Sequence, residues 1–187
     1  MKIKQSLDEL IVLKNILSTK EFYQIQDEFF YNQWDFNKKE PMQNAAYPIR
    51  GSLRKPKYGN NIGDNITFLN IGSRLKLHAQ KILRKKLELK RVNTNIQFFG
   101  QNSYFHVDSS IKNPAWSVIV FCNKSWDANW GGEFVIKTDE DDYSYVPYIP
   151  NTGVLIPAWL EHQGLPPNRL CNLPRLSVAF TYHEIVV

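Results

Sequence analysis

Cysteine is scarce in this sequence, and long apolar runs are absent. Its 187 residues include two cysteines, Cys122 and Cys171. Two are too few for a disulfide framework or a cysteine-rich metal site, and Cys122 lies in an apolar run where it should act as a small hydrophobic residue. No apolar stretch reaches the roughly 20 residues that a membrane-spanning helix needs, and the basic start at Met1–Gln5 lacks the apolar segment of a secretion signal. We therefore expect a soluble protein of the cytoplasm.

Internal repeats and low-complexity segments are also missing, which argues against a solenoid and against a disordered chain. Hydrophobic residues make up 43% of the sequence and aromatic residues 13%. A chain of this length and composition can bury a sizeable core, so we expect one domain over residues 1–187. Within it, residues 1–91 are predicted to form a helical and loop-rich support region, and residues 92–187 a β-rich core.

Acidic residues are few in the first half. Residues 1–91 hold 18 Lys and Arg against 9 Asp and Glu (+9), and residues 92–187 hold 5 against 9 (−4), which gives the net +5. The basic residues cluster at Arg50–Lys57 and Arg84–Lys86. Such clusters can attract nucleic acid, but most surface lysines are merely solvated, and no basic strand interleaved with aromatic residues is present. Nucleic acid is therefore a less favoured partner.

Helical patterns are confined to the first half. Apolar residues at helical spacing predict a helix over Leu7–Leu17, and Ser18–Glu21 has the residues that start a second one. Ser73 is the expected N-cap of a third helix that runs to about Leu89, preceded at Thr67–Ile71 by a short strand or a lead-in to that helix. Residues 37–65 have no sustained period and are expected to form irregular connections.

Short apolar and aromatic runs separated by turn residues follow Val92. This density of short strands is typical of a sandwich or barrel, and the acidic stretch 138–142 is expected to be an exposed turn. The fold class is therefore α+β and mainly β. The expected strands are Asn95–Phe99, Tyr104–Asp108, Trp116–Cys122, Glu133–Ile136, Tyr143–Tyr148, Gly153–Ile156 and Leu176–Tyr182.

A candidate metal site begins at His106 and Asp108. Two residues that are two positions apart on an extended segment point to the same side. A second histidine from a distant strand, with His162 as the candidate, would complete two imidazoles and one carboxylate on one face of a metal. This ligand set suits non-haem Fe(II) and leaves coordination positions open.

The ordered set His106-x-Asp108, Trp130-Gly131-Gly132-Glu133, His162 and Arg175-x-Ser177 resembles the 2-oxoglutarate- and Fe(II)-dependent dioxygenases. The resemblance is to their prolyl-4-hydroxylase-like branch and covers about residues 95–183. It implies a double-stranded β-helix core, of the jelly-roll or cupin-like kind, with the N-terminal helices packed on its sheet. The Gly131–Gly132 pair is expected to serve backbone geometry.

The resemblance also implies the cofactors and their ligands. His106, Asp108 and His162 would be both the catalytic set and the metal ligands that hold Fe(II), with 2-oxoglutarate as co-substrate and O2 as oxidant. Arg175 would bind the far carboxylate of 2-oxoglutarate, and Ser177 would add a hydroxyl donor. The reaction would release succinate and CO2 and hydroxylate a C–H bond.

The sequence departs from the family at one position and leaves the substrate open. The family often has a tyrosine on the strand before His-x-Asp that reaches 2-oxoglutarate, and this chain has Phe98–Phe99 there. Tyr104 is the candidate substitute, with Asn102 or Asn123 as alternatives. His78 and His183 are expected to be structural.

Because related halogenases lack the carboxylate that Asp108 supplies, hydroxylation is favoured over halogenation. The first substrate to consider is a prolyl residue in a peptide or protein. A free amino acid or another small metabolite is the alternative. A second alternative, from a different functional class, is that the chain is a non-catalytic β-helix binding module. The oligomeric state is open.

Overall fold

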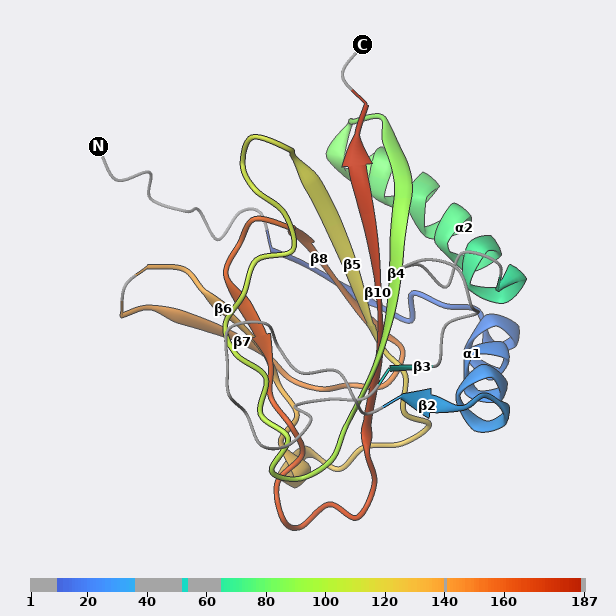
Figure 1. Ribbon diagram of the computed structural model, residues 1–187, viewed down its shortest axis with the longest axis vertical. Helices are drawn as coiled ribbons and strands as arrows, with labels where there is room; N and C mark the ends of the chain where they lie inside the picture. Colours follow the sequence, from blue (N-terminus) through green and yellow to red (C-terminus); the bar gives the residue numbers. More distant parts are fainter. Residues whose placement is uncertain (1–9, 36–51, 54–64, 140, 186–187) are drawn as a thin grey trace.

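The protein is built in three layers, with two helices on one side of a large sheet and a small sheet on the other (Figure 1). The computed structural model describes residues 10–35, 52–53, 65–139 and 141–185. Its helices and strands are β1 (Ile11–Lys14), α1 (Thr19–Tyr31), β2 (Trp34–Asp35), β3 (Ser52–Leu53), α2 (Ile66–Leu83), β4 (Leu87–Gln97), β5 (Ala115–Phe121), β6 (Phe134–Lys137), β7 (Tyr143–Val146), β8 (Thr152–Pro157), β9 (His162–Gly164) and β10 (Arg175–Glu184).

The strands form two facing antiparallel sheets. The large sheet has the order β1-β8-β5-β10-β4, and the small sheet has the order β7-β6-β9. A further short pair joins β2 to β3. Two antiparallel sheets packed face to face, with helices on the outer side of the larger one, confirm the predicted jelly-roll fold with N-terminal helices on its sheet.

Strand β5 lies in the middle of the molecule, and all of its residues are buried. Trp116, Val118 and Val120 belong to the apolar cluster under the helices, whereas Ile119 and Phe121 belong to a second cluster between the two sheets. Side chains alternate along a strand, so a strand covered on both faces is apolar throughout. This explains the unbroken apolar run of the sequence at this place.

Helix α1 begins where the sequence predicts. The amide of Glu21 donates to Ser18 Oγ at 3.3 Å, and the amide of Ser18 donates to Glu21 Oε2 at 2.8 Å. This reciprocal capping satisfies two backbone donors that the first turn leaves unpaired. Ile25 and Phe29, one turn apart, face the sheet and are buried.

Helix α2 begins earlier than predicted. Its N-cap is Asn65, whose Oδ1 accepts the amide of Phe68 at 3.1 Å, and Ser73 lies inside the helix. The stretch Thr67–Ile71 is therefore helical from the start. The expected end at Leu89 is also wrong, because Arg84 takes a left-handed conformation (φ 55°) and the chain turns into β4.

The predicted helix over Leu7–Leu17 is wrong in its described part. Residues 11–14 form strand β1, which pairs with β8 and is one edge of the large sheet. Ile11 and Leu13 pack against the core under the helices, and Val12 between them is 43% exposed. The same leucines and isoleucines fit a period of two as well as a helical period, and pairing with β8 decides between the two. Leu7 lies outside the described residues.

Strand β4 runs from Leu87, well before the expected Asn95, so it spans the expected division between residues 91 and 92. The expected strand Tyr104–Asp108 is instead an irregular segment with one isolated bridge, between His106 and His162. The five strands expected after Asp108 are confirmed as β5, β6, β7, β8 and β10. The single-domain organisation stays a prediction.

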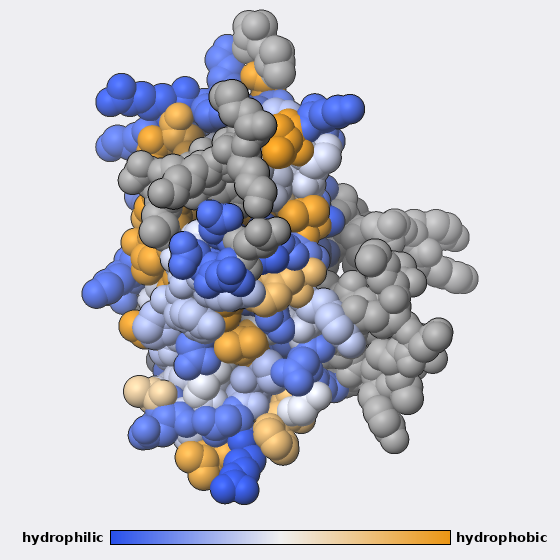
Figure 2. All heavy atoms as spheres, turned by 90° about the vertical axis from the view of Figure 1, so that its left-hand side faces the viewer, coloured by the Kyte–Doolittle hydropathy of each residue, from blue (hydrophilic) through white to orange (hydrophobic). Residues whose placement is uncertain are grey.

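The surface is mixed in character. On the face in Figure 2, hydrophobic residues lie in small groups between hydrophilic ones, as is usual for a protein surface. Among the described helices, none combines the length and the apolar character needed to cross a membrane. In the basic cluster Arg84–Lys86, the Lys85 ammonium pairs with Glu184 at 2.6 Å. Most of the cluster Arg50–Lys57 lies outside the described residues.

Candidate functional site

His106 and His162 are brought together by their own backbones. The amide of His106 donates to the carbonyl of His162 at 3.0 Å, and the reverse bond measures 2.9 Å. The two ring centroids are 4.6 Å apart. His162 is also paired with Ile136 of β6, so the small sheet fixes both histidines on its inner side.

Both imidazoles present the same nitrogen to the interior. His106 Nδ1 lies 2.8 Å from the carbonyl oxygen of Tyr104, and His162 Nδ1 lies 2.8 Å from that of Leu160. A carbonyl oxygen only accepts, so each Nδ1 carries a proton, and in the neutral form of the ring the lone pair is then on Nε2. In this tautomer Nε2 of each ring is the nitrogen that can bind a metal.

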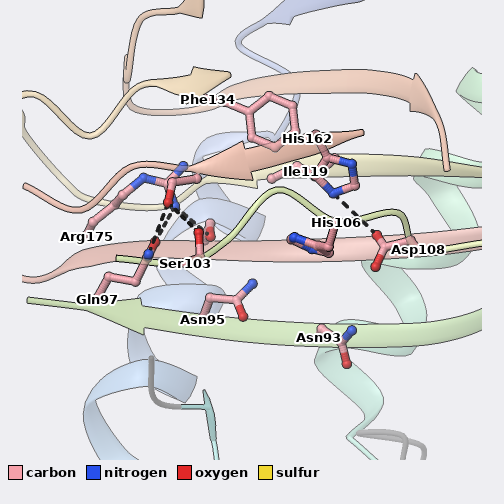
Figure 3. A pocket seen from close by; sticks show the side chains of 13 residues that line it. Asn93, Asn95, Gln97, Ser103, His106, Asp108, Ile119, Phe134, His162 and Arg175 are labelled. Carbon is pink, nitrogen blue, oxygen red and sulfur yellow. Dashed lines mark hydrogen bonds and ion pairs between the residues drawn. The ribbon is translucent and has the colours of Figure 1, made fainter. Parts of the chain in front are cut away.

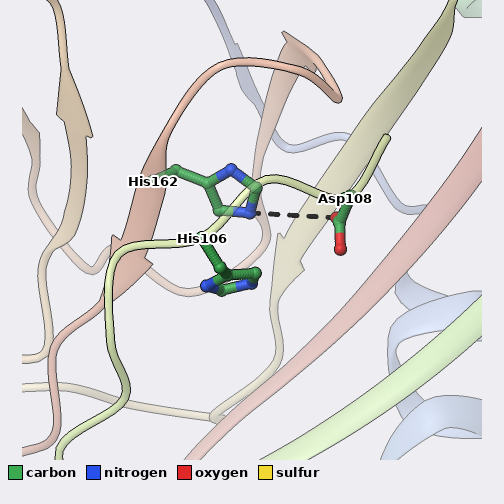
Figure 4. A group of neighbouring side chains, drawn as sticks. All are labelled: His106, Asp108 and His162. Atoms are coloured by element: carbon green, nitrogen blue, oxygen red, sulfur yellow. Dashed lines mark ion pairs between the residues drawn. The ribbon is translucent and has the colours of Figure 1, made fainter. Parts of the chain in front are cut away.

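Asp108 completes the group (Figure 4). The carbonyl of Ala158 accepts the amides of Asp108 and Ser109 at 2.7 and 3.0 Å, which anchors this irregular segment beside the end of β8. Asp108 Oδ2 lies 3.8 Å from His162 Nε2. One candidate ligand atom from each of His106, Asp108 and His162 lies within 4.8 Å of the other two. Two imidazoles and one carboxylate so placed can share a divalent metal ion.

The three side chains lie at one end of a pocket between the two sheets, and Arg175 lies at the other end (Figure 3). The pocket has about 520 Å³ of empty space, part of it open to solvent. Its walls are mostly polar, with apolar contributions from both sheets. The lining residues are Asn93, Asn95, Gln97, Ser103, His106, Asp108, Ile119, Phe134, His162, Gly164, Arg175, Ser177 and Ala179.

Arg175 is 2% exposed, yet its guanidinium is not fully paired. Its Nε donates to the carbonyl of Gly132 at 2.8 Å, and its Nη1 donates to Gln97 Oε1 at 3.3 Å and Ser177 Oγ at 3.2 Å. Its Nη2 is buried and has no hydrogen-bond partner among the described residues. A buried donor without an acceptor is costly, so this atom fits an anionic ligand in the pocket.

The surroundings of Arg175 compensate its charge only in part. Burial lowers the pKa of its guanidinium, and burial raises the pKa of the neighbouring Cys122 thiol and Tyr148 phenol, so that both neighbours are neutral. The ring of Tyr148 lies 4.9 Å from the guanidinium carbon. Glu133 adds a favourable charge interaction, but no described carboxylate forms an ion pair with Arg175. A carboxylate ligand would supply the missing charge.

Two glycines next to Arg175 allow close packing, Gly164 against its guanidinium and Gly132 against Trp126. A Cβ on Gly164 would lie 3.2 Å from Arg175 Nη1, and a Cβ on Gly132 would lie 3.0 Å from the ring of Trp126. Gly132 also has a φ of +85°, which side-chain-bearing residues rarely adopt. The Gly131–Gly132 pair thus serves backbone geometry, as the sequence predicts, and it lets the chain pass close to the guanidinium.

The structure brings most of the predicted site residues into one pocket. His106, Asp108, His162, Arg175 and Ser177 all line it. The side chain of Tyr104 does not, because it is 49% exposed, and the residue contributes its carbonyl oxygen to His106 instead.

The two alternatives to Tyr104 also lie outside the pocket. Asn102 is exposed. Asn123 is occupied elsewhere, since its amide group donates to the carbonyl of Pro174 at 2.8 Å and accepts the amide of Leu176 at 2.8 Å. None of the three proposed substitutes for the missing tyrosine therefore reaches the pocket.

Sequence reasoning missed the polar side of β4. Asn93, Asn95 and Gln97 line the pocket, while Val92, Thr94 and Ile96, which alternate with them, are buried on the other face. Large polar side chains at every second position, opposite the side of Val92, Thr94 and Ile96, were the available signal. Ser103 was missed as well; its hydroxyl donates to the carbonyl of Gly164 at 2.8 Å.

No protein-family model and no curated protein sequence matches the chain, but solved structures do. A prolyl hydroxylase from Trichoplax adhaerens, in complex with a peptide fragment of the hypoxia inducible factor oxygen degradation domain, superposes with a TM-score of 0.68 at 12% identity, over 95% of this chain and 84% of that one. An oxidoreductase of the 2OG-Fe(II) oxygenase family from Burkholderia pseudomallei gives a TM-score of 0.67 at 16% identity, over 95% and 85%. The chain has the fold of the 2OG-Fe(II) oxygenases.

A third oxygenase-fold structure is HygX from Streptomyces hygroscopicus, which contains nickel, 2-oxoglutarate and hygromycin B. It superposes with a TM-score of 0.61 at 12% identity, over 94% of this chain and 82% of that one. At these identities the likeness establishes the fold, and the chemistry of the site has to be argued from the residues of this chain.

Proposed function

We propose that this chain is an Fe(II)- and 2-oxoglutarate-dependent dioxygenase that hydroxylates a substrate C–H bond. The observation that carries the proposal is the arrangement of one pocket, with a cluster of two histidines and one aspartate at one end and a buried, incompletely paired arginine at the other. The donor set fits a divalent iron, and the unpaired guanidinium N–H fits the far carboxylate of a dicarboxylic acid.

In this proposal His106 Nε2, His162 Nε2 and Asp108 Oδ2 hold the metal. When bound, the metal and 2-oxoglutarate supply the oxidising chemistry, with O2 as oxidant and succinate and CO2 as products. The protein holds the ligand side chains in fixed positions. The backbone bonds of both Nδ1 atoms keep the imidazoles from rotating, and the Ala158 carbonyl keeps Asp108 facing them.

Arg175 sets the other end of the co-substrate. Its fork is held in place by Gly132, Gln97 and Ser177, so the free N–H points to one fixed place in the pocket. Ser177 accepts a bond from Arg175 through a lone pair, and its own hydroxyl proton remains available to a carboxylate. A rigid, buried arginine strengthens carboxylate binding because neither group keeps its water.

For the substrate, we propose a prolyl residue in a peptide or protein. A peptide-bound prolyl hydroxylase with the same fold supports it. The pocket is also lined by the half-buried amide side chains of Asn93 and Asn95, which can both donate to and accept from a peptide bond. The alternative is a small molecule, and HygX, with hygromycin B bound, supports that one.

Turnover separates the enzyme from a non-catalytic binding module of the same fold. Purified protein, loaded with Fe(II) under ascorbate, is incubated with 2-oxoglutarate and a library of proline-containing peptides. We expect succinate to form and one peptide to gain one oxygen atom by mass spectrometry. Formation of neither product, although iron and 2-oxoglutarate both bind, would contradict a prolyl peptide as substrate and leave the small-molecule hydroxylase and the binding module as the two alternatives. Succinate without peptide oxidation would direct the search to small molecules.

A further inference from the structure

Both oxygens of the Asp108 carboxylate accept hydrogen bonds from side chains. Arg91 Nη2 donates to Oδ1 at 2.8 Å, and Ser117 Oγ donates to Oδ2 at 3.3 Å. Ser117 in turn shares a 3.3 Å hydrogen bond with Thr181 Oγ1. The oxygen bound by Arg91 is not the one that lies 3.8 Å from His162 Nε2. Arg91 therefore contacts the side of the carboxylate that faces away from the histidines.

Arg91, Thr181 and Ser117 form a row across three neighbouring strands. Thr181 of β10 is paired in register with Arg91 of β4 on one side and with Ser117 of β5 on the other. Ser117 is fully buried and Thr181 is 2% exposed. A polar row of this kind in a buried sheet costs free energy unless its members have partners, and the partner it reaches is Asp108.

A bulge in β4 turns Arg91 towards this row. The register of β4 against β10 shifts at Thr181, so that Thr181 faces Arg91 and Tyr182 faces Leu89. Leu89 and Val92, three positions apart, both pack on the core under the helices, which an unbroken strand with a period of two does not allow. Arg91 follows the ordinary alternation with the pocket-lining Asn93 and Asn95, and the extra residue before it, Lys90, lets Leu89 lie on the core face.

The ion pair is poorly explained by stability alone. The side chain of Arg91 is 33% exposed, a setting in which an ion pair contributes little. Its Nε is buried without a hydrogen-bond partner among the described residues, so this position does not satisfy all the hydrogen-bond donors of the guanidinium. Its placement is explained if it serves the carboxylate that it touches.

We propose that Arg91 is a positioning residue that occupies Asp108 Oδ1 and leaves Oδ2 as the single oxygen offered to a metal. This rests on the proposed metal site and adds a residue outside the ligand set. A carboxylate so held binds through one oxygen and leaves more of the metal open to other ligands. It also cannot turn away when no metal is present.

The test is binding of Ni(II) to the full-length protein by isothermal titration calorimetry, with the melting temperature of each metal-free variant as a second measurement. Arg91→Gln is expected to weaken Ni(II) binding by about 10- to 100-fold. Arg91→Lys keeps one N–H donor for Oδ1 and is expected to recover most of the lost affinity. Ser117→Ala, which removes the weaker contact, should have a smaller effect than Arg91→Gln.

The matched control is Arg74→Gln. Arg74 forms an ion pair of similar exposure with Glu21, 42% and 17% against 33% and 15% for Arg91 and Asp108, and it lies on α2, away from the pocket. It should change the melting temperature as Arg91→Gln does, and leave Ni(II) affinity unchanged. If Arg91→Gln binds Ni(II) as wild type does, or more tightly, the inference is wrong while the metal site stands. If wild type fails to bind Ni(II), the metal site falls, and the inference falls with it.

Discussion

The ten residues of strand β10 are divided between two faces that have different tasks. One face carries Val178, Phe180 and Tyr182, which are fully buried under the helices. The other carries Arg175 and Ser177, which line the pocket. The apolar face gains its free energy from water-excluding packing, whereas the polar face holds a buried cation that the described protein leaves incompletely paired.

The comparison teaches that stability and chemistry are separable on this strand. Successive side chains point to opposite sides, so a change on one face leaves the other in place. Substitutions on the helix side should lower the free energy of unfolding without altering ligand affinity at the folded site. Substitutions on the pocket side should lower ligand affinity and leave the free energy of unfolding nearly unchanged.

The largest effect is expected at the metal end of the pocket. His106→Ala removes one of three ligands and should abolish Fe(II)-dependent turnover, while the metal-free protein keeps its circular dichroism spectrum and melting temperature within a few degrees. Turnover by the variant and its metal content by mass spectrometry measure this. His78→Ala, at an exposed position of α2, is the control. Full turnover by His106→Ala would place the metal elsewhere.

On the helix side, Phe180→Ala should lower the free energy of unfolding by about 3–5 kcal/mol. Phe180 is fully buried, and its ring packs so closely on Gly72 that a Cβ there would lie 3.0 Å away. Urea denaturation measures the loss. The 2-oxoglutarate affinity of the folded fraction should stay at the wild-type value; a parallel loss would mean that the two faces are coupled.

On the pocket side, Arg175→Ala should weaken 2-oxoglutarate binding by about 1.5–3 kcal/mol, as expected for a hydrogen bond to a charged group. Equilibrium binding in the presence of Ni(II) measures it. The control is Arg169→Ala, which removes an exposed arginine from the segment before β10. An unchanged affinity in Arg175→Ala would remove this residue as the carboxylate-binding group.

The smallest and sharpest comparison uses one hydroxyl from each face. Tyr182 donates to the carbonyl of Gly72 at 2.9 Å, and Ser177 accepts from Arg175 at 3.2 Å. Tyr182→Phe should lower stability by about 0.5–1.5 kcal/mol with no change in 2-oxoglutarate affinity. Ser177→Ala should weaken 2-oxoglutarate binding by a similar amount with little change in stability. If both variants shift both quantities, the separation of the faces fails.

Much of this arrangement could be predicted from the sequence because it follows from local period. Arg175 and Ser177 share a face by alternation, and the acidic residue three positions after Ser18 marks the start of α1. The fold followed from the ordered motifs and from the density of short strands. Resemblance supplied the pairing of His106 with His162, which lie 56 positions apart and meet through a backbone bridge that no local pattern encodes.

The wrong predictions of secondary structure also have a physical cause, which is that local period alone does not fix these segments. Ile11 and Leu13 satisfy a helical and an extended period alike, and only β8 decides for the strand. Leu87 and Leu89 continue the apolar pattern of α2, which hid the start of β4 and with it Arg91. The bulge opposite Thr181 changes the phase of β4, so a period of two read from Leu87 and Leu89 wrongly puts Arg91 on the core face, whereas it lies beside Asp108.

The most direct test of the account is an anaerobic titration of the metal-free protein with Fe(II) and then 2-oxoglutarate, followed by visible absorption. A keto acid chelated to Fe(II) gives a charge-transfer band that neither component gives alone. The account predicts that the band appears in wild type, is lost in His106→Ala and needs far more 2-oxoglutarate in Arg175→Ala. Iron binding without the band in wild type would contradict it, because the two ends of the pocket would then not hold one ligand between them.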